Sequence, residues 1–141
     1  AGYTAAWGAD VSQAGFTRNC LAVFVDEKAK SAGSDQEHWV GKEEGKPAPV
    51  AEPVEKNPTQ ESRQEEFDNK TMTDDHGMQI FGIARDQNGK KYYMVKNSWG
   101  VTGKYDGIWY ATEAFVKGQS LDIMIHKSAL PKDLKTKLGI K

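Results

Sequence analysis

The chain has 141 residues, of which 38% are hydrophobic and 28% charged, and its formal net charge at pH 7 is -1. This length fits one domain or part of a larger one. The sequence contains neither a dominant basic patch nor an apolar stretch of about 20 residues, which argues against nucleic-acid binding and against a membrane-spanning helix. The N-terminus lacks the basic and apolar regions of a signal peptide, so we expect none.

The first third of the chain combines two strand-like runs with a polar stretch. Tyr3–Val11 and Leu21–Val25 contain residues that favour strands, which predicts a strand in each. Between about Asp26 and Pro58 the residues Lys, Glu, Gly and Ser dominate, and prolines interrupt any regular element. This composition predicts a long polar surface loop at about 26–58.

The middle of the chain predicts a helix followed by a β-hairpin. Thr59 comes after a proline and is a candidate N-cap for a short polar helix that ends near Asn69. The apolar run Met78–Ala84 and the run Lys91–Lys96 flank a turn that contains Asn88-Gly89. Because Asn-Gly strongly favours tight turns between paired strands, these two runs predict a hairpin.

The last third predicts short elements joined by turns. Ile108–Ala111 is a strand candidate, Thr112 can cap a short helix, and the alternation in Leu121–His126 predicts another strand. Pro131 is suited to begin a final helix and Gly139 to end it. Strands linked by short turns, with little helix, predict an α+β fold built on a small antiparallel sheet or half-barrel.

Two chemically informative residues are expected at the open end of the hairpin. That end holds His76, before the first strand, and Asn97, after the second strand. A histidine can act as the base for a thiol only if its ring is held in one tautomer, and the side-chain oxygen of Asn97 can accept the proton of the far ring nitrogen. If the second strand continues, Trp99 points to the same face and would shield this hydrogen bond from water.

The residues around this pair resemble a known family. DDHGMQIFGI at 74–83 and MVKNSWG at 94–100 resemble the histidine and asparagine blocks of papain-like cysteine peptidases. TAAWGADVSQAGF at 4–16, TQESRQEEFDN at 59–69 and the ending at 121–141 resemble segments of the bleomycin hydrolase and aminopeptidase C branch. The resemblance covers almost the whole chain except the loop at about 26–58. It implies that residues 1–141 form the β-rich C-terminal domain of the papain-like fold.

The resemblance also implies roles for individual residues. His76 would be the general base and acid, Asn97 would orient it, and Trp99 would shield the pair. The family takes its nucleophilic cysteine and its oxyanion glutamine from an N-terminal domain that has no counterpart in this sequence. Cys20, the one cysteine, has no glutamine six residues before it and no tryptophan after it, so we interpret it as a structural or surface thiol. The parent protein is therefore expected to be a cysteine-type aminopeptidase that hydrolyses peptides, and this chain alone is expected to be inactive.

Further expectations come from the same branch. Its C-terminal arm lies in the active-site cleft, where the terminal carboxylate engages the amino group of the substrate, so the carboxylate of Lys141 is a candidate substrate-binding group. The branch forms hexamers and is mostly cytoplasmic, and it needs no cofactor. The spacing of His38, His76 and His126 does not resemble a metal site, so we expect no bound metal.

Two other interpretations remain open at the level of the sequence. The missing nucleophile also fits a non-catalytic, peptidase-like domain that binds a partner or regulates one. A purely structural β-domain without a site is a third possibility, which the positions of His76 and Asn97 around an Asn-Gly hairpin make less attractive.

Overall fold

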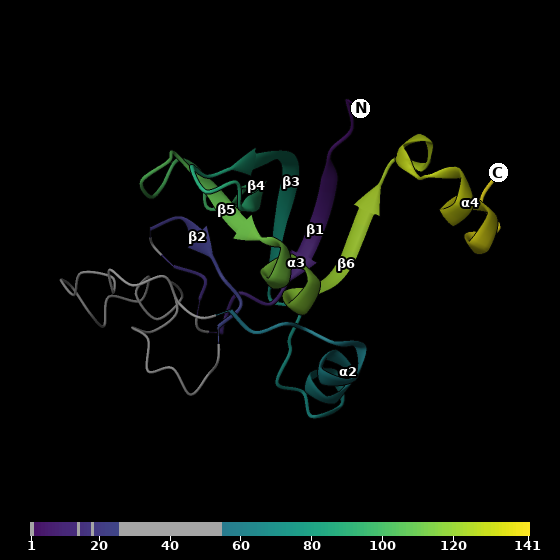
Figure 1. The fold of residues 1–141 in the computed structure, drawn as a ribbon, viewed down its shortest axis with the longest axis horizontal. Coiled ribbons are helices and arrows are strands. Elements are labelled where there is room, and N and C mark those ends of the chain that lie inside the picture. Colours follow the sequence, from purple (N-terminus) through teal and green to yellow (C-terminus); the bar gives the residue numbers. More distant parts are fainter. Residues whose placement is uncertain (1, 14, 18, 26–54) are drawn as a thin grey trace.

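The computed structural model describes residues 2–13, 15–17, 19–25 and 55–141 (Figure 1). Residues 26–54, which form most of the predicted polar loop, lie outside the described residues. The described part forms one six-stranded sheet with three α-helices and one 3-10 turn. In this part no helix is long and apolar enough to cross a membrane.

The sheet is mixed, and its strands lie in the order β2-β5-β4-β3-β1-β6. Every neighbouring pair is antiparallel except β2 and β5, which run parallel. The α+β prediction is confirmed, and the parallel pair is a departure from the expected antiparallel sheet. The strands span Ala5–Ala9 (β1), Leu21–Ala22 (β2), His76–Arg85 (β3), Lys91–Lys96 (β4), Ile108–Thr112 (β5) and Ser120–Ile125 (β6).

The predicted hairpin forms from β3 and β4. Its loop is closed by the side chain of Asp86, which accepts the backbone N–H groups of Asn88 and Lys90 at 2.8 and 2.9 Å. Gly89 has a φ of +82°, a backbone conformation that glycine adopts at little steric cost. The register between β3 and β4 shifts between Ile80 and Gly82, as at a β-bulge.

The two N-terminal strands are shorter than the sequence suggested. β1 covers only Ala5–Ala9, yet it is the central partner of both β3 and β6. Of the predicted strand Leu21–Val25, Leu21 and Ala22 pair with β5, and Val25 forms only an isolated bridge with Glu55. Residues 23–25 are nevertheless buried, because they pack into the interior beside the sheet. Their apolar run reflects burial more than strand pairing.

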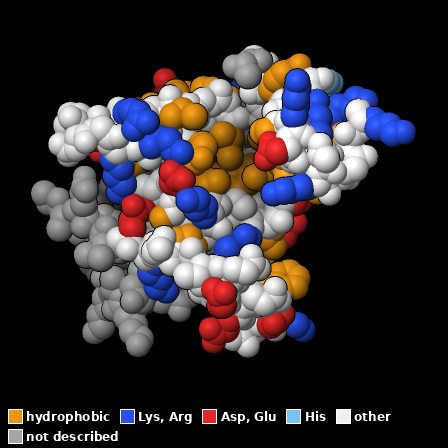
Figure 2. Space-filling view, turned by 45° about the vertical axis from the view of Figure 1, so that its right-hand side comes forward, with side chains coloured by type: hydrophobic (Ala, Val, Ile, Leu, Met, Phe, Trp, Pro, Cys, Tyr) orange, Lys and Arg blue, Asp and Glu red, His pale blue; other side chains and the backbone are white. Residues whose placement is uncertain are grey.

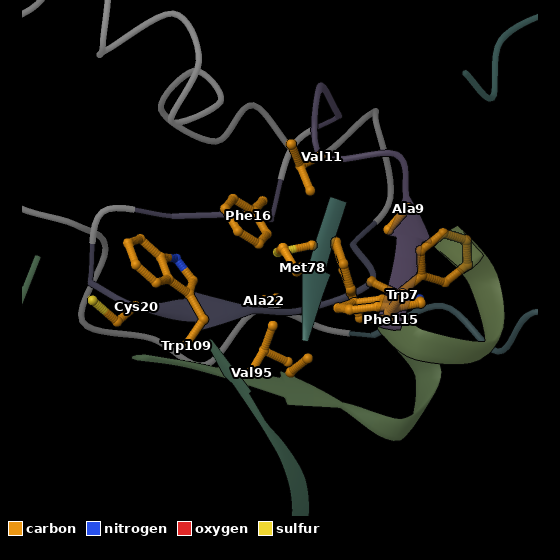
Figure 3. Packing of buried hydrophobic residues seen from close by; sticks show 12 residues of the cluster. Trp7, Ala9, Val11, Phe16, Cys20, Ala22, Met78, Val95, Trp109 and Phe115 are labelled. Carbon is orange, nitrogen blue, oxygen red and sulfur yellow. The ribbon is translucent and has the colours of Figure 1, made fainter. Parts of the chain in front are cut away.

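The core lies between the sheet, the segment after β1, and helix α3, which spans Glu113–Gln119 (Figure 3). Phe16 is at its centre and packs against Trp109, stacked at a centroid distance of 5.7 Å, and against Phe115 at 6.0 Å. Phe115 also meets Trp7 edge-on at 6.3 Å. Helix α3 begins at Thr112, whose hydroxyl accepts the N–H of Phe115. The cap and the aromatic contacts together fix α3 on the sheet.

Two other helices lie at the periphery (Figure 1). Helix α2 spans Gln60–Asp68 and begins with the predicted cap at Thr59, where a capping box with Ser62 is present. Helix α4 spans Lys132–Leu138 and ends at Gly139 in a left-handed conformation, as predicted. Neither helix contains a buried residue. Figure 2 shows basic side chains spread over this face and a group of acidic side chains at its lower end.

Candidate active site

The structure brings His76 and Asn97 into direct contact. Nε2 of His76 lies 2.7 Å from Oδ1 of Asn97. His76 is the first residue of β3 and pairs with Ala9 of β1, whereas Asn97 follows the last residue of β4. The hairpin therefore joins the two side chains from positions that are 21 residues apart. This geometry is what the sequence predicted for the open end of the hairpin.

Asn97 is held independently of the histidine. Its backbone N–H donates to the carbonyl oxygen of Gly107 at 2.9 Å, and its side-chain oxygen accepts the N–H of Trp99 at 3.3 Å. Only 3% of Asn97 is exposed. Gly107 has a φ of +85°, and a β-carbon there would lie 2.1 Å from the oxygen of Gly100, so only glycine fits. The turn thus presents Oδ1 of Asn97, rather than its amino group, to His76.

This arrangement fixes the tautomer of His76. The carbonyl oxygen of an asparagine side chain accepts hydrogen bonds and donates none, so the neutral ring must carry its proton on Nε2. Nδ1 then holds a lone pair and can accept a proton. Within the described residues no hydrogen bond to Nδ1 is observed. In this tautomer the ring can act as a base through Nδ1.

Aromatic rings enclose one side of the pair. The ring of Trp99 lies 4.8 Å from that of His76 at an angle of 46°, and Phe16 meets His76 edge-on at 6.4 Å. The second strand of the hairpin ends at Lys96, its predicted end, so Trp99 lies in the following turn and not on a continuation of the strand. It still covers the histidine, because the turn folds its ring back onto the core beside Phe16 and Trp109. Such packing excludes water and strengthens the hydrogen bond.

An open cavity of ≈ 970 Å³ begins at the pair and extends across the sheet. Strands β1, β3 and β6 and the turn after β4 supply its walls. Gly77 lies in its floor, where a β-carbon would meet no atom within 4 Å. Asp74, Asp75 and Asp122 supply negative charge, and Lys96 supplies positive charge. A space of this size is sufficient for several residues of a peptide.

Two other residues considered in the sequence lie away from this cavity. Cys20 is fully buried in the aromatic core and does not line the cavity (Figure 3). Lys141 follows α4, which the chain reaches through a 3-10 turn at Lys127–Ala129 beyond the end of β6 (Figure 1). It does not line the cavity either. The structure therefore joins His76, Asn97 and Trp99 and leaves Lys141 apart from them.

Sequence reasoning gave no role to two residues that support the site. Phe16 and Asp10 both lie within the segment at 4–16 that resembles the branch, where Asp10 is the aspartate of Trp-Gly-x-Asp-Val, but that resemblance suggested no role for either residue. Phe16 is fully buried beneath the His76 and Trp99 rings. Asp10 is a fully buried carboxylate beside the segment that leads to His76. Burial of a charged side chain is a structural signal that the sequence alone does not carry.

Comparisons with known proteins agree with this architecture. A solved structure of PepW from Lactobacillus rhamnosis HN001 superimposes with a TM-score of 0.58 at 18% sequence identity. The match covers 96% of this chain and 26% of the PepW chain, so the present chain spans about a quarter of that protein. At this identity the likeness establishes the fold. No curated protein matches the sequence.

A family comparison extends the relationship from fold to ancestry. The family described as the peptidase C1-like family matches residues 52–140, which is more than half of the chain and includes both His76 and Asn97. The predicted relationship to papain-like cysteine peptidases is thereby confirmed. The chain belongs to the peptidase C1-like family.

Proposed function

We propose that this chain supplies the histidine and asparagine half of a cysteine-type aminopeptidase site and is inactive by itself. The observation that carries the proposal is the 2.7 Å contact between Nε2 of His76 and Oδ1 of Asn97, beside an open cavity. A base with a fixed tautomer is what a thiol nucleophile requires. The family relationship supports a peptide as the substrate.

The proposed reaction needs a thiol that this sequence does not place at the site. Nδ1 of His76 would take the proton of that thiol, and the thiolate would attack the carbonyl carbon of a peptide bond. The imidazolium would then give the proton to the leaving amine. Water would hydrolyse the resulting thioester with the same histidine acting as base. Asn97 would keep the ring oriented through each proton transfer.

The inactivity of the isolated chain follows from its single cysteine. Cys20 is the one thiol of the sequence, and it is buried in the core outside the cavity. A nucleophile buried in this way cannot reach a substrate. We therefore propose that a cysteine-bearing, mainly helical domain, which also supplies an oxyanion glutamine, completes the site, and that the complete protein is cytoplasmic and homo-oligomeric.

A complementation experiment tests the proposal. The chain is expressed alone, and also fused behind the cysteine-bearing domain of a peptidase C1-like protein, and both are assayed with an aminoacyl fluorogenic substrate. We expect no turnover from the chain alone, turnover from the fusion, and loss of that turnover in the His76→Ala fusion. Turnover by the isolated chain, or a fusion whose activity is unchanged by His76→Ala, would refute the proposal.

The same buried thiol also favours a second candidate, a non-catalytic peptidase-like domain that binds a peptide in the cavity. The two candidates differ in what the fusion does. A binding domain would retain affinity for a peptide, measured by fluorescence anisotropy, while the fusion with an intact thiol remained inactive. An active fusion would exclude it.

A further inference from the structure

We infer that Asp10 is a positioning residue for His76, and this inference rests on the proposed role of His76 as the base. Asp10 lies immediately after β1, and its side chain is fully buried. The last backbone pair between β1 and β3 joins Ala9 to His76. Beyond that pair the ladder ends, so other contacts must hold the chain that enters His76.

The carboxylate of Asp10 joins the two segments where the ladder stops. Oδ2 accepts the backbone N–H of Thr73 at 3.0 Å and the side-chain amide of Gln13 at 3.3 Å. Oδ1 accepts the backbone N–H and the hydroxyl of Ser12 at 2.8 and 2.7 Å. One buried carboxylate therefore fixes both the turn after β1 and the segment three residues before His76. All four donors are neutral groups.

A second carboxylate makes the reciprocal connection. Oδ1 of Asp75, the residue next to His76, accepts the backbone N–H of Val11 at 3.0 Å. Gln13 adds a third tie, since its amide also donates to the carbonyl oxygen of Thr71 at 2.9 Å. The segment 71–75 is thus attached to the turn after β1 at every second residue, through Thr71, Thr73 and Asp75. We call these contacts the aspartate clasp.

The clasp acts on one partner of the catalytic pair and not on the other. Asn97 is fixed by Gly107 and by the N–H of Trp99, and neither group touches the clasp. A shift of the segment 71–75 would therefore move His76 while Asn97 stayed in place. Hydrogen bonds to a buried carboxylate are stronger than bonds between neutral groups, and donors left without an acceptor cost further free energy. Loss of Asp10 should accordingly lengthen the His76–Asn97 contact.

The inference is tested by nitrogen NMR of the histidine rings in the full chain at about pH 8, above the ordinary histidine pKa of about 6.5. The measured quantities are the tautomer of His76 and the exchange rate of its Nε2–H with water. The variants are Asp10→Ala, which removes every acceptor, and Asp10→Asn, which keeps one oxygen. The matched control is Asp86→Ala, which removes an aspartate that accepts two backbone N–H groups in the hairpin loop.

We expect Asp10→Ala to give a mixture of tautomers and an exchange rate about tenfold higher, which corresponds to about 1.4 kcal/mol. Asp10→Asn should have an intermediate effect, and it decides the question if the alanine variant does not fold. Asp86→Ala should lower the melting temperature and leave the His76 signals unchanged. If the Asp10 variants keep the wild-type tautomer and exchange rate of His76, Asp10 does not position the ring and the inference is wrong. A wild-type chain without a single Nε2–H tautomer would instead refute the proposed function itself.

Discussion

The site end of the sheet is held by contacts between segments that are distant in the sequence, whereas the two peripheral helices bury no residue. At the site end, His76 contacts Asn97, Trp99 and Phe16, and the buried carboxylate of Asp10 and the exposed one of Asp75 hold the chain that leads to it. Helices α2 and α4, in contrast, contain no buried residue, and local capping is observed at the start of α2 and at the end of α4. The contacts that hold His76 against Asn97 all come from this chain. The orientation of α4, which leads to Lys141, is not determined by packing in the same way.

The largest expected difference between the two regions is in the free energy of unfolding that a truncated apolar side chain costs. Phe16→Ala should reduce the free energy of unfolding by about 3–5 kcal/mol, because Phe16 is fully buried among four aromatic rings beneath the site. Leu138→Ala in α4 should change it by less than about 0.5 kcal/mol, since 58% of Leu138 is exposed. Urea denaturation measures both values. Similar losses of unfolding free energy in the two variants would contradict the proposed difference between the site end and α4.

A smaller effect separates two helix caps of the same residue type. Thr112 caps α3 and is 1% exposed, whereas Thr59 caps the peripheral helix α2. Loss of an N-cap costs about 0.5–2 kcal/mol, and the buried cap should lie at the upper end because the N–H of Phe115 would lose its acceptor inside the core. We expect Thr112→Ala to cost more than Thr59→Ala in urea denaturation. An equal or larger loss of stability in Thr59→Ala would show that α3 is no better anchored than α2.

The smallest effect is electrostatic and depends on pH. Glu113 bonds Lys117 at 2.9 Å and Lys91 of β4 at 3.0 Å, and these bonds lower the pKa of its carboxyl group from 4.5 to about 2. Because the folded-state pKa is depressed, the stabilisation is present above pH 4.5 and is lost as the pH falls toward about 2. The melting temperature of the wild type should therefore approach that of Glu113→Gln across this interval. Since the carboxylate is half exposed, added salt should also narrow the difference. A constant difference at every pH would contradict the ion-pair assignment.

The sequence predicted local elements well. Strand β4 was predicted with its observed bounds at Lys91–Lys96, and Thr59 and Gly139 mark the ends of α2 and α4 as expected. These features depend on neighbouring residues, through hydrogen bonds and backbone conformations that cap helices and form tight turns. The meeting of His76 and Asn97 could be predicted for the same reason, because a hairpin is a local structure.

The sequence did not predict contacts between distant segments. The parallel pairing of Leu21 with Tyr110 joins residues far apart in the chain, and no local pattern specifies a partner at that distance. The bond from Thr73 to Asp10 was missed for the same reason, since a buried carboxylate looks like any polar residue until the fold encloses it. The position of Trp99 could be predicted only on the condition that the strand continued, and the strand ends at Lys96.

The length of the hairpin also separates its loop from the cavity, so the loop is a suitable place for attaching a label. Strand β3 has ten residues, so the loop at 86–90 lies roughly 30 Å along the strand from His76. A fluorophore or an affinity tag attached in that loop would report on the chain without entering the cavity. The same distance should allow residues to be inserted at the tip while His76 and Asn97 keep their geometry.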